Sequence, residues 1–297
     1  MLNKNLINII TIEPTHLILK INKKMSYKQL LAFFYCSIHR EKHFCCIHKG
    51  AEINNPSTNP STQLEEGYYE FYFELPNLSI PKSTTFPHIV YEDEICLIAN
   101  KPSYLLVHND GNNRDNLQEQ VNLHLYQNGW PYQSQAIHRL DYQTSGLVLF
   151  SKFPFFQGLF DEIISTHAIE KKYYALLQGN VAFKTKTIQL PIGKDRHINN
   201  KMRIHTKGKE ATTHLKKIKN FSTSCLVEAN IETGRKHQIR VHCQAIGHPI
   251  INDPIYGTIQ DQRGLMLQNH YLKFKHPITE EYICVDIPVD PRFKTKS

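Results

Sequence analysis

Hydrophobic positions recur with two different periods along the chain. Apolar residues fall three or four positions apart in residues 116–128 and 155–167, which predicts two amphipathic helices. A third helix is predicted for residues 235–246, because Gly247 and Pro249 end the helical pattern there. Short runs with the composition of strands lie between these segments. The predicted strands cover residues 94–100, 147–150, 172–177, 225–231 and 282–287.

The order of these elements bears on the fold class. Predicted helices and strands do not alternate regularly along the chain, and no internal repeat is evident. A regular alternation would be typical of a parallel sheet with crossover helices, so its absence favours an α+β fold. We therefore expect a mostly antiparallel mixed sheet flanked by helices.

The first 80 residues have a pattern of their own. Apolar positions at helical spacing predict a helix over residues 26–39, and residues 68–75 have the composition of a strand. Residues 54–63 are rich in Asn, Pro, Ser and Thr, which predicts an exposed turn. Residues 76–87 have the character of a linker. We expect a small N-terminal α+β region over residues 1–80 and a larger domain over residues 86–297.

Composition and charge narrow the class of protein. The 297 residues are 40% hydrophobic and 21% charged, which is typical of a soluble globular protein. The net charge of +8 and the pI near 9.0 favour a polyanionic partner, above all nucleic acid. No apolar run approaches the roughly 20 residues of a membrane-spanning helix, and the N-terminus lacks a signal-peptide pattern. We expect a cytoplasmic protein that has no membrane partner.

Cysteine usage agrees with a reducing compartment. The chain has seven cysteines, an odd number, and several lie in apolar segments as small hydrophobic residues do. One cluster combines His39, His43, Cys45, Cys46 and His48, which are residue types that bind zinc. Zinc ligands usually have a Cys-x-x-Cys spacing, which two adjacent cysteines do not provide. We expect no metal and interpret the cluster as core and surface positions.

Polar residues with catalytic potential precede the apolar run at residues 147–150. Residues 138–151 read HRLDYQTSGLVLFS, so a polar loop that contains Asp141 leads directly into a short strand. A rigid strand that delivers a polar loop is a common setting for a functional site. An Asp between an Arg and a Thr/Ser pair is also a common turn residue. The residues alone leave both interpretations open.

The same stretch resembles the central motif of the RluA-type pseudouridine synthases, and further segments match this family in order. DEICLIANKPSYLLVH resembles the family's strand and Lys-Pro turn, and EKKYYALLQG its Lys-x-Tyr strand. GKEATT matches a smaller landmark, and TGRKHQIRVHCQAIGHPIINDPIYG matches the long C-terminal motif. The resemblance covers residues 86–291. Gln268 and Asn269 depart from it, because the family commonly has a His-Ala pair there.

The resemblance implies an enzyme that isomerises uridine to pseudouridine in RNA. It implies that Asp141 is the nucleophile, that Tyr173 lies against the target base, and that Arg240 pairs with the catalytic carboxylate. The target base must leave its stack to reach such a site. Because the isomerisation adds and removes nothing, we expect no cofactor.

Basic residues around these positions are expected to contact RNA. Residues 192–220 contain nine Lys or Arg and only two acidic residues, which suits phosphate binding but is also compatible with a solvated loop. The expected RNA-binding residues are His138, Arg139, Lys171, Lys194, Arg196, Lys201, Arg203, Lys209, Arg235 and His237.

Two questions of partners stay open at this point. Many family members carry an N-terminal RNA-binding module of helices followed by strands, and residues 1–80 either form a degenerate version of it or an extension packed on the catalytic domain. We expect a monomer without an obligate protein partner. The expected substrate is ribosomal or transfer RNA, and ribosomal RNA is slightly favoured if residues 1–80 bind RNA. The alternative is a non-catalytic RNA-binding or ribosome-assembly protein on the same fold. The joint presence of Asp141, Tyr173 and Arg240 argues against this alternative.

Overall fold

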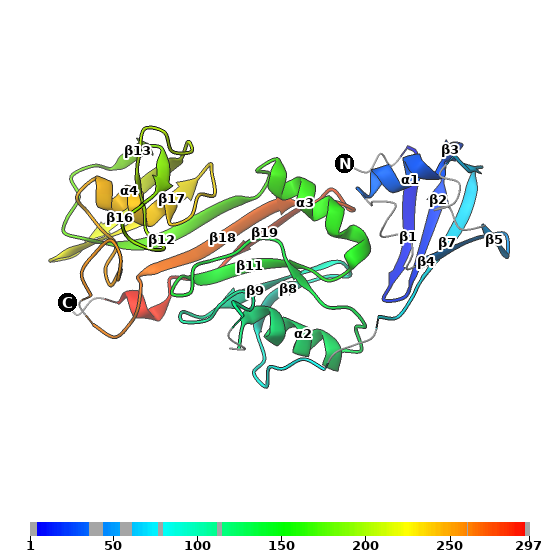
Figure 1. Ribbon diagram of the computed structural model, residues 1–297, viewed down its shortest axis with the longest axis horizontal. Helices are drawn as coiled ribbons and strands as arrows, with labels where there is room; N and C mark the ends of the chain where they lie inside the picture. The colour runs from blue at the N-terminus through cyan, green and yellow to red at the C-terminus, as the bar shows by residue number, and fades with distance from the viewer. Residues whose placement is uncertain are drawn as a thin grey trace.

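A long twisted sheet runs through the greater part of the molecule (Figure 1). The computed structural model describes residues 5–35, 44–53, 61–76, 80–111, 115–259 and 261–294. Within them a ten-stranded sheet has the order β13-β16-β17-β12-β18-β11-β9-β8, and β10 and β19 pair with β11 and β18. Its strands are β8 (His88–Glu92), β9 (Cys96–Lys101), β10 (Gln135–Ala136), β11 (Ser145–Ser151), β12 (Glu170–Gln178), β13 (Thr185–Gln189), β16 (Thr212–Asn220), β17 (Ser224–Ile231), β18 (Leu267–Lys275) and β19 (Tyr282–Asp286).

The sheet is antiparallel with one exception, the parallel pair of β11 and β18. This agrees with the expected α+β fold with a mostly antiparallel mixed sheet. All seven residues of β11 are buried, which explains its continuous apolar run. Leu147 and Leu149 pack into one hydrophobic cluster, and Val148 and Phe150 pack into another on the opposite face.

Helices cover the two faces of the sheet. Helix α2 (Leu117–Gln127) contributes Leu117, Val121 and Leu125 to the cluster of Val148 and Phe150. Helix α3 (Gln157–Ser165), preceded by the short helix η2 (Pro154–Phe156), covers the opposite face. Helix α4 (Gln238–Ala245) lies near the other end of the sheet, and the short helix η3 (Pro291–Phe293) follows β19 (Figure 1).

Helix boundaries follow local capping chemistry. The side chain of Asn116 accepts a hydrogen bond from Glu119 N and starts α2 where the sequence predicts it. Helix α4 begins later than the predicted residue 235, because His237 adopts a left-handed conformation with φ of 57°. Gly247, with φ of 81°, follows the last turn of α4 as predicted.

A second, smaller sheet forms at the N-terminal end of the chain. Its five strands have the order β1-β2-β7-β4-β5, and helix α1 (Tyr27–Phe33) lies beside them. Ser26 and Gln29 form a capping box at the start of α1. Among its described residues a β-hairpin precedes α1, whereas in the family's RNA-binding module helices come first. The strands of the region are β1 (Ile7–Glu13), β2 (His16–Ile21), β3 (Met25–Ser26), β4 (Phe44–His48), β5 (Ala51–Ile53), β6 (Gln63–Leu64) and β7 (Gly67–Phe73).

Aromatic side chains join the small sheet to the large one. Phe155 of η2 packs 4.8 Å from Phe34 and 5.3 Å from Phe73, measured between ring centroids. Gly158 of α3 lies so close to Tyr35 that an added Cβ would be 2.3 Å from the Tyr35 carbonyl oxygen. The two sheets therefore share one hydrophobic cluster, to which α3 also contributes.

Several strands of the structure escape prediction from local pattern. Strand β16 carries five Lys, His or Asn residues among its nine, and its buried positions are only Thr213 and Leu215. Strands of this kind form because a neighbour supplies the hydrogen-bonding partners, here β17 and β13. None of the described helices is long and apolar enough to cross a membrane.

Candidate active site

A polar loop over residues 137–144 leads from β10 into β11 and carries Asp141. Thr144 N donates a hydrogen bond to Asp141 O at 3.0 Å, which closes a turn at the carboxylate-bearing residue. The buried ammonium of Lys101 donates to the carbonyl oxygens of Pro102, Leu105 and Tyr142 at 2.6–3.2 Å. Burial lowers the pKa of Lys101 to about 7. Lys101, expected to shape a turn, thus ties that turn to the loop of Asp141.

The parallel pairing of β11 with β18 fixes the position of this loop. Gly146 has φ of +114°, and a Cβ there would lie 2.1 Å from Asn269 O. Asn269 Nδ2 donates to Leu147 O at 3.0 Å across the same pair. Gln268 binds the C-terminal segment, because its Oε1 accepts from Asp290 N and its Nε2 donates to Pro288 O. The two residues that depart from the family pattern therefore make cross-links by hydrogen bonds. Asn269 joins β18 to β11, and Gln268 joins β18 to the C-terminal segment.

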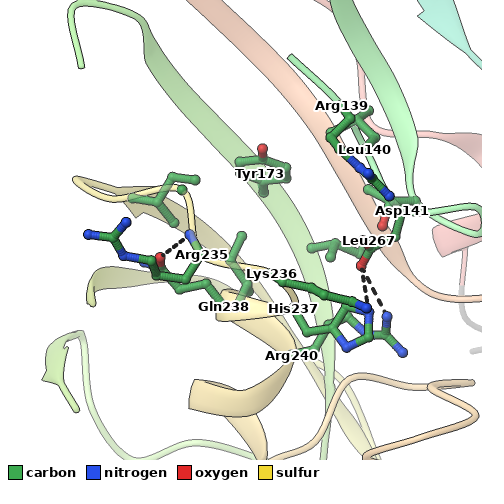
Figure 2. A pocket seen from close by; sticks show the side chains of 14 residues that line it. Arg139, Leu140, Asp141, Tyr173, Arg235, Lys236, His237, Gln238, Arg240 and Leu267 are labelled. Atoms are coloured by element: carbon green, nitrogen blue, oxygen red, sulfur yellow. Dashed lines mark hydrogen bonds and ion pairs between the residues drawn. The ribbon is translucent and has the colours of Figure 1, made fainter. Parts of the chain in front are cut away.

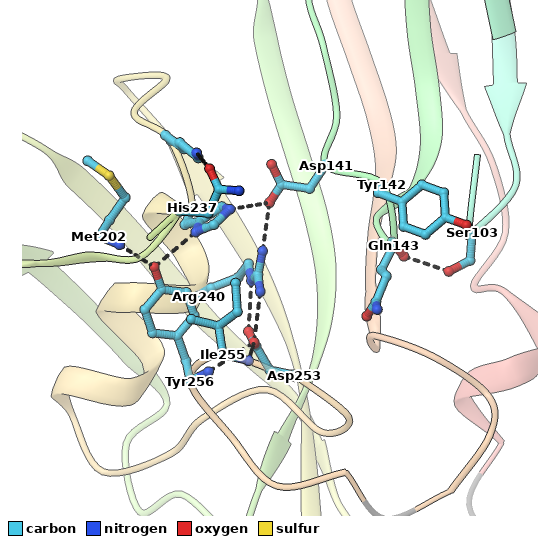
Figure 3. A network of polar contacts seen from close by, with 12 residues as sticks. Ser103, Asp141, Tyr142, Gln143, Met202, His237, Arg240, Asp253, Ile255 and Tyr256 are labelled. Carbon is cyan, nitrogen blue, oxygen red and sulfur yellow. Dashed lines mark hydrogen bonds and ion pairs between the residues drawn. The ribbon is translucent and has the colours of Figure 1, made fainter. Parts of the chain in front are cut away.

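Helix α4 brings Arg240 to the carboxylate of Asp141. Arg240 NH1 donates to Asp141 Oδ2 at 3.0 Å, while Nε and NH2 donate to Asp253 Oδ2 and Oδ1, each at 2.8 Å (Figure 3). Burial alone would lower the pKa of Arg240, but its hydrogen bonds and the charges of Asp253 and Asp141 outweigh burial and raise it. The arginine is therefore a fixed cation that orients one carboxylate oxygen of Asp141.

His237 faces the same oxygen from the start of α4. Its Nε2 lies 3.6 Å from Asp141 Oδ2, and its Nδ1 lies 2.9 Å from the hydroxyl oxygen of Tyr256 (Figure 3). Met202 N donates to this hydroxyl oxygen, so the hydroxyl proton is available for His237 Nδ1. Burial lowers the pKa of His237 to about 4, against the charge of Asp141. The ring is therefore neutral at neutral pH, and Arg240 is the cation that pairs with Asp141.

Tyr173 forms the wall of the site from strand β12. Its side chain is buried and points into the same pocket as Asp141 (Figure 2). Burial, and then the negative charge of Asp141, raise the pKa of Tyr173. Its hydroxyl group has no hydrogen-bond partner among the described residues. The side chain is therefore held in place by the packing of its ring in the hydrophobic core.

The pocket itself has a volume of about 340 Å³ and unites the three expected catalytic residues. Asp141, Tyr173 and Arg240 come from a loop, a strand and a helix and line one cavity (Figure 2). The expected RNA-binding residues Arg139, Arg235 and His237 line it too, whereas His138 and Lys171 line an adjoining cavity.

The basic segment lies beside this pocket and not within it. Strands β14 (Ile192–Lys194) and β15 (Met202–Ile204) form a hairpin that reaches α4 through Tyr256. The Nζ atom of Lys201 lies 5.8 Å from the Tyr256 ring centroid. Lys194, Arg196 and Lys209 are exposed, whereas Arg203 is half-buried.

Asp253 and Tyr256 are site residues that the sequence reasoning did not single out. Both lie in the NDPIYG end of the long C-terminal motif, and Asp253 is fully buried. Asp253 Oδ1 also accepts hydrogen bonds from Ile255 N and Tyr256 N. A charged residue inside an apolar segment was the available signal, because a buried carboxylate needs a partner.

Two groups of residues combine cysteine with other potential metal ligands. His39 and His43 lie outside the described residues, and Cys45 and Cys46 point to opposite faces of β4. Asp93, Cys96 and His276 approach one another within 4.8 Å. However, His276 Nδ1 accepts from Ile278 N and Thr279 N, which leaves the ring proton on Nε2, the atom that faces Asp93. A metal at Nε2 would shift this proton to Nδ1, where two backbone N–H groups already donate, so we interpret this trio as a hydrogen-bonded core.

The chain is similar in sequence to known proteins. The sequence profile of RNA pseudouridylate synthase matches residues 95–245. A Bacillus subtilis protein named uncharacterized RNA pseudouridine synthase YhcT is 33% identical over 206 residues, which cover 67% of this chain and 68% of the relative. Ribosomal large subunit pseudouridine synthase D of Zymomonas mobilis is 33% identical over 218 residues, with coverage of 67% and 68%.

A solved structure shares the fold. Human RNA pseudouridylate synthase domain containing 1 superimposes with a TM-score of 0.59 at 28% identity, over 71% of this chain and 86% of the human one. The matched residues 95–245 hold Asp141, Tyr173 and Arg240, the three side chains that converge on one pocket. By sequence and by fold, the chain belongs to the RNA pseudouridylate synthase family.

Proposed function

We propose that this protein converts specific uridines of ribosomal RNA to pseudouridine, with Asp141 as the nucleophile and with the target base flipped into the pocket. The proposal rests mainly on one observation: the two oxygens of the Asp141 carboxylate have different surroundings. Arg240 binds Asp141 Oδ2, and no partner within the described residues binds Oδ1 (Figure 3). One oxygen is therefore anchored while the other is free to react.

The reaction requires one bond exchange on the target nucleotide. The bond between the base nitrogen N1 and the ribose carbon C1′ breaks, and a bond between the base carbon C5 and C1′ forms. The proton on C5 leaves, and N1 gains one, so nothing is added overall. Asp141 can assist by attack on the sugar, by attack on the base ring, or through a glycal intermediate. The proposal assigns the covalent role to Asp141 and leaves these routes open.

Tyr173 suits the role of a stacking platform for the flipped base. Its raised pKa keeps the hydroxyl protonated at neutral pH, so Tyr173 is poorly suited to act as a general base. A ring of this kind supports any base through its π-face. Flipping costs a few kcal/mol, which such stacking helps to recover.

Ribosomal RNA is the favoured substrate, and transfer RNA is the second. Ribosomal large subunit pseudouridine synthases are among the relatives of known name. The exposed cations Lys194, Arg196 and Lys209 beside the pocket support contact with an extended polyanion. We propose that the protein acts as a monomer.

The direct test maps pseudouridines in total RNA from cells with and without the protein. We expect a small set of ribosomal positions to lose pseudouridine, and purified protein to restore it in unmodified RNA. Restoration only in transfer RNA would assign the second substrate. Unchanged RNA in both experiments would leave the non-catalytic RNA-binding alternative.

Asp141→Asn tests the nucleophile. The change preserves size but removes nucleophilicity, so we expect no detectable isomerisation with RNA binding and folding retained. Arg240→Lys keeps a charge but loses the planar fork, so the rate should fall more than RNA affinity does. Because both residues serve one step, the double variant should be no slower than Asp141→Asn alone.

The control for this series is Asp261→Asn, which removes a carboxylate that pairs with Arg263 outside the pocket. This variant should retain wild-type rates. Appreciable turnover by Asp141→Asn would contradict the proposed mechanism.

A further inference from the structure

A second cavity, here named the side pocket, opens beside Asp141. It has a volume of about 300 Å³ and lies between the end of α3, strand β12 and the loop that follows β17. Arg139, Tyr173 and Arg235 line both cavities, so the side pocket continues the one that holds Asp141. His138 and Lys171 complete its polar lining together with Thr233.

Lys171 brings a positive charge into the side pocket from β12. Side chains alternate along a strand, so Lys171 shares a face with Tyr173, while Lys172 points to the other face. Lys172 Nζ lies 3.3 Å from Glu170 Oε1 and 4.4 Å from the Tyr271 ring centroid. For Lys171, no ion-pair or hydrogen-bond partner is present in the described part of the chain, and burial lowers its pKa.

The other charged groups add to this excess of positive charge. Arg139 is exposed and has no carboxylate partner among the described residues. Arg235 Nε donates to Glu210 O at 2.9 Å, and its terminal nitrogens stay available. Glu232 is the one acidic residue of the lining, and its Oε1 pairs with His214 Nε2 at 2.7 Å.

His138 lines the side pocket with an uncharged imidazole ring. Its Nε2 accepts a hydrogen bond from Leu149 N at 3.3 Å, so the ring is fastened to β11. Burial, and then the charge of Lys171, lower the pKa of His138 to about 3. The cationic character of the side pocket therefore comes from one lysine and two arginines, which outnumber the exposed carboxylate of Glu232.

We propose that the side pocket binds a backbone phosphate that flanks the target uridine, with Lys171 as the principal ligand and Arg139 and Arg235 at the rim. The proposal rests on the proposed function, because an RNA strand with its base against Tyr173 carries a phosphate on either side of that nucleotide. A half-buried cation without a counter-charge destabilises the free protein. A phosphate supplies both the missing charge and several hydrogen-bond acceptors.

The test compares Lys171→Met with Lys172→Met in the Asp141→Asn background, which we expect to bind RNA without turnover. The RNA is a fragment around a mapped target uridine, and affinity is measured across a series of salt concentrations. Loss of one phosphate contact should reduce the slope of log affinity against log salt by about 0.7–0.9. We expect this change for Lys171→Met alone, with at least a tenfold loss of affinity at low salt.

Two further measurements separate a phosphate ligand from a structural lysine. Lys171→Met should melt at the same or a higher temperature than the wild type, since it removes an unbalanced charge, and Lys171→Arg should keep the salt slope. Each phosphate next to the target is then replaced by a neutral methylphosphonate. At one of these positions, the replacement should weaken RNA binding by the protein that retains Lys171. The same replacement should cause no further loss of RNA affinity in the Lys171→Met variant.

Contrary outcomes are distinct for the two proposals. Equal salt slopes for Lys171→Met and Lys172→Met, or additive losses from Lys171→Met and every methylphosphonate, would overturn the phosphate site while pseudouridine formation stands. Absence of RNA binding and of pseudouridine formation by the wild type would instead overturn the proposed function, and the phosphate site with it.

Discussion

The guanidinium group of Arg240 donates hydrogen bonds to two aspartates, and these bonds fix the arrangement of the site. Asp253 accepts hydrogen bonds from Nε and NH2, and Asp141 accepts one from NH1. Asp253 is itself held by the backbone N–H groups of Ile255 and Tyr256, so the fork has a fixed direction. A planar fork can serve both carboxylates at once, which a lysine cannot do in this geometry.

The role of Tyr173 is open to a direct test at the residue scale. Tyr173→Phe keeps the ring and removes a hydroxyl that has no partner within the described residues, so we expect most activity to remain. Tyr173→Leu removes the π-face, which should lower transition-state stabilisation by about 1–3 kcal/mol. Single-turnover rates on target RNA measure both. A nearly inactive Phe variant that still binds RNA would show that the hydroxyl transfers a proton.

His237 makes stability depend on pH. Its folded pKa of about 4 lies below the ordinary value of 6.5, so the stability that it contributes is complete above pH 6.5 and is lost as pH falls toward 4. Between pH 7 and pH 5 this amounts to about 2 kcal/mol. We expect His237→Asn, whose side chain tolerates the left-handed backbone, to reduce the loss of unfolding free energy over this range by that amount.

The matched control for His237 is His167→Asn. His167 has a similar left-handed backbone, with φ of 55°, but it is exposed. Denaturant unfolding at the two pH values should give His167→Asn the pH dependence of the wild type. The same dependence in His237→Asn would contradict the assignment of a buried neutral ring.

At the scale of elements, the catalytic loop is placed by the contact of β11 with β18. The parallel pair begins at Ser145 and Gly146, directly after the loop, and it is the one parallel contact among the described strands of the large sheet. Close approach of the backbones at Gly146 leaves no room for a side chain. A short contact next to Asp141 therefore decides where its carboxylate meets α4.

Gly146→Ala tests this placement. The new Cβ would lie 2.1 Å from Asn269 O, so β11 and β18 must move apart, and we expect a large loss of both stability and isomerisation rate. Gly129→Ala is the control, because Gly129 is also left-handed, with φ of +75°, but has no atom within 4 Å of the added Cβ. That change should cost only about 1 kcal/mol of backbone strain. Thermal unfolding and RNA turnover measure both variants, and equal effects would show that the contact does not place the loop.

At the scale of the whole molecule, the two sheets share a hydrophobic cluster. Phe34 and Phe73 of the N-terminal region contact Phe155 directly, and Tyr132 donates a hydrogen bond to Glu74 O. We propose on this basis that residues 1–80 form an extension packed on the catalytic domain. Its removal would expose the rings beside α3, with a loss of solubility.

Phe155→Ala measures this coupling. Phe155 is buried against rings from both sheets, so we expect the free energy of unfolding to fall by about 3–5 kcal/mol, in one cooperative transition. Phe86→Ala serves as the control, because Phe86 is 52% exposed and should change stability by less than about 1 kcal/mol. Calorimetry that resolves two independent transitions would argue that the N-terminal region folds by itself.

The sequence by itself determined the elements with strong local signals. Helices α2 and α3 lie where the apolar periodicity predicts them, and the buried strand β11 lies where the apolar run predicts it. Such signals act over about ten residues, within reach of hydrogen bonding and side-chain spacing along one element. The family motifs likewise indicate Asp141, Tyr173 and Arg240 from sequence alone.

Only the tertiary structure decided how these residues meet. Asp141 and Arg240 stand 99 positions apart, and their contact depends on the pairing of strands that are distant in sequence. The hairpin of β1 and β2, the polar strand β16 and the role of Asp253 likewise depend on partners elsewhere in the chain. Local pattern determines which face of an element is apolar, whereas packing determines what that face covers and which polar groups it brings together, because burial couples all parts of a core at once.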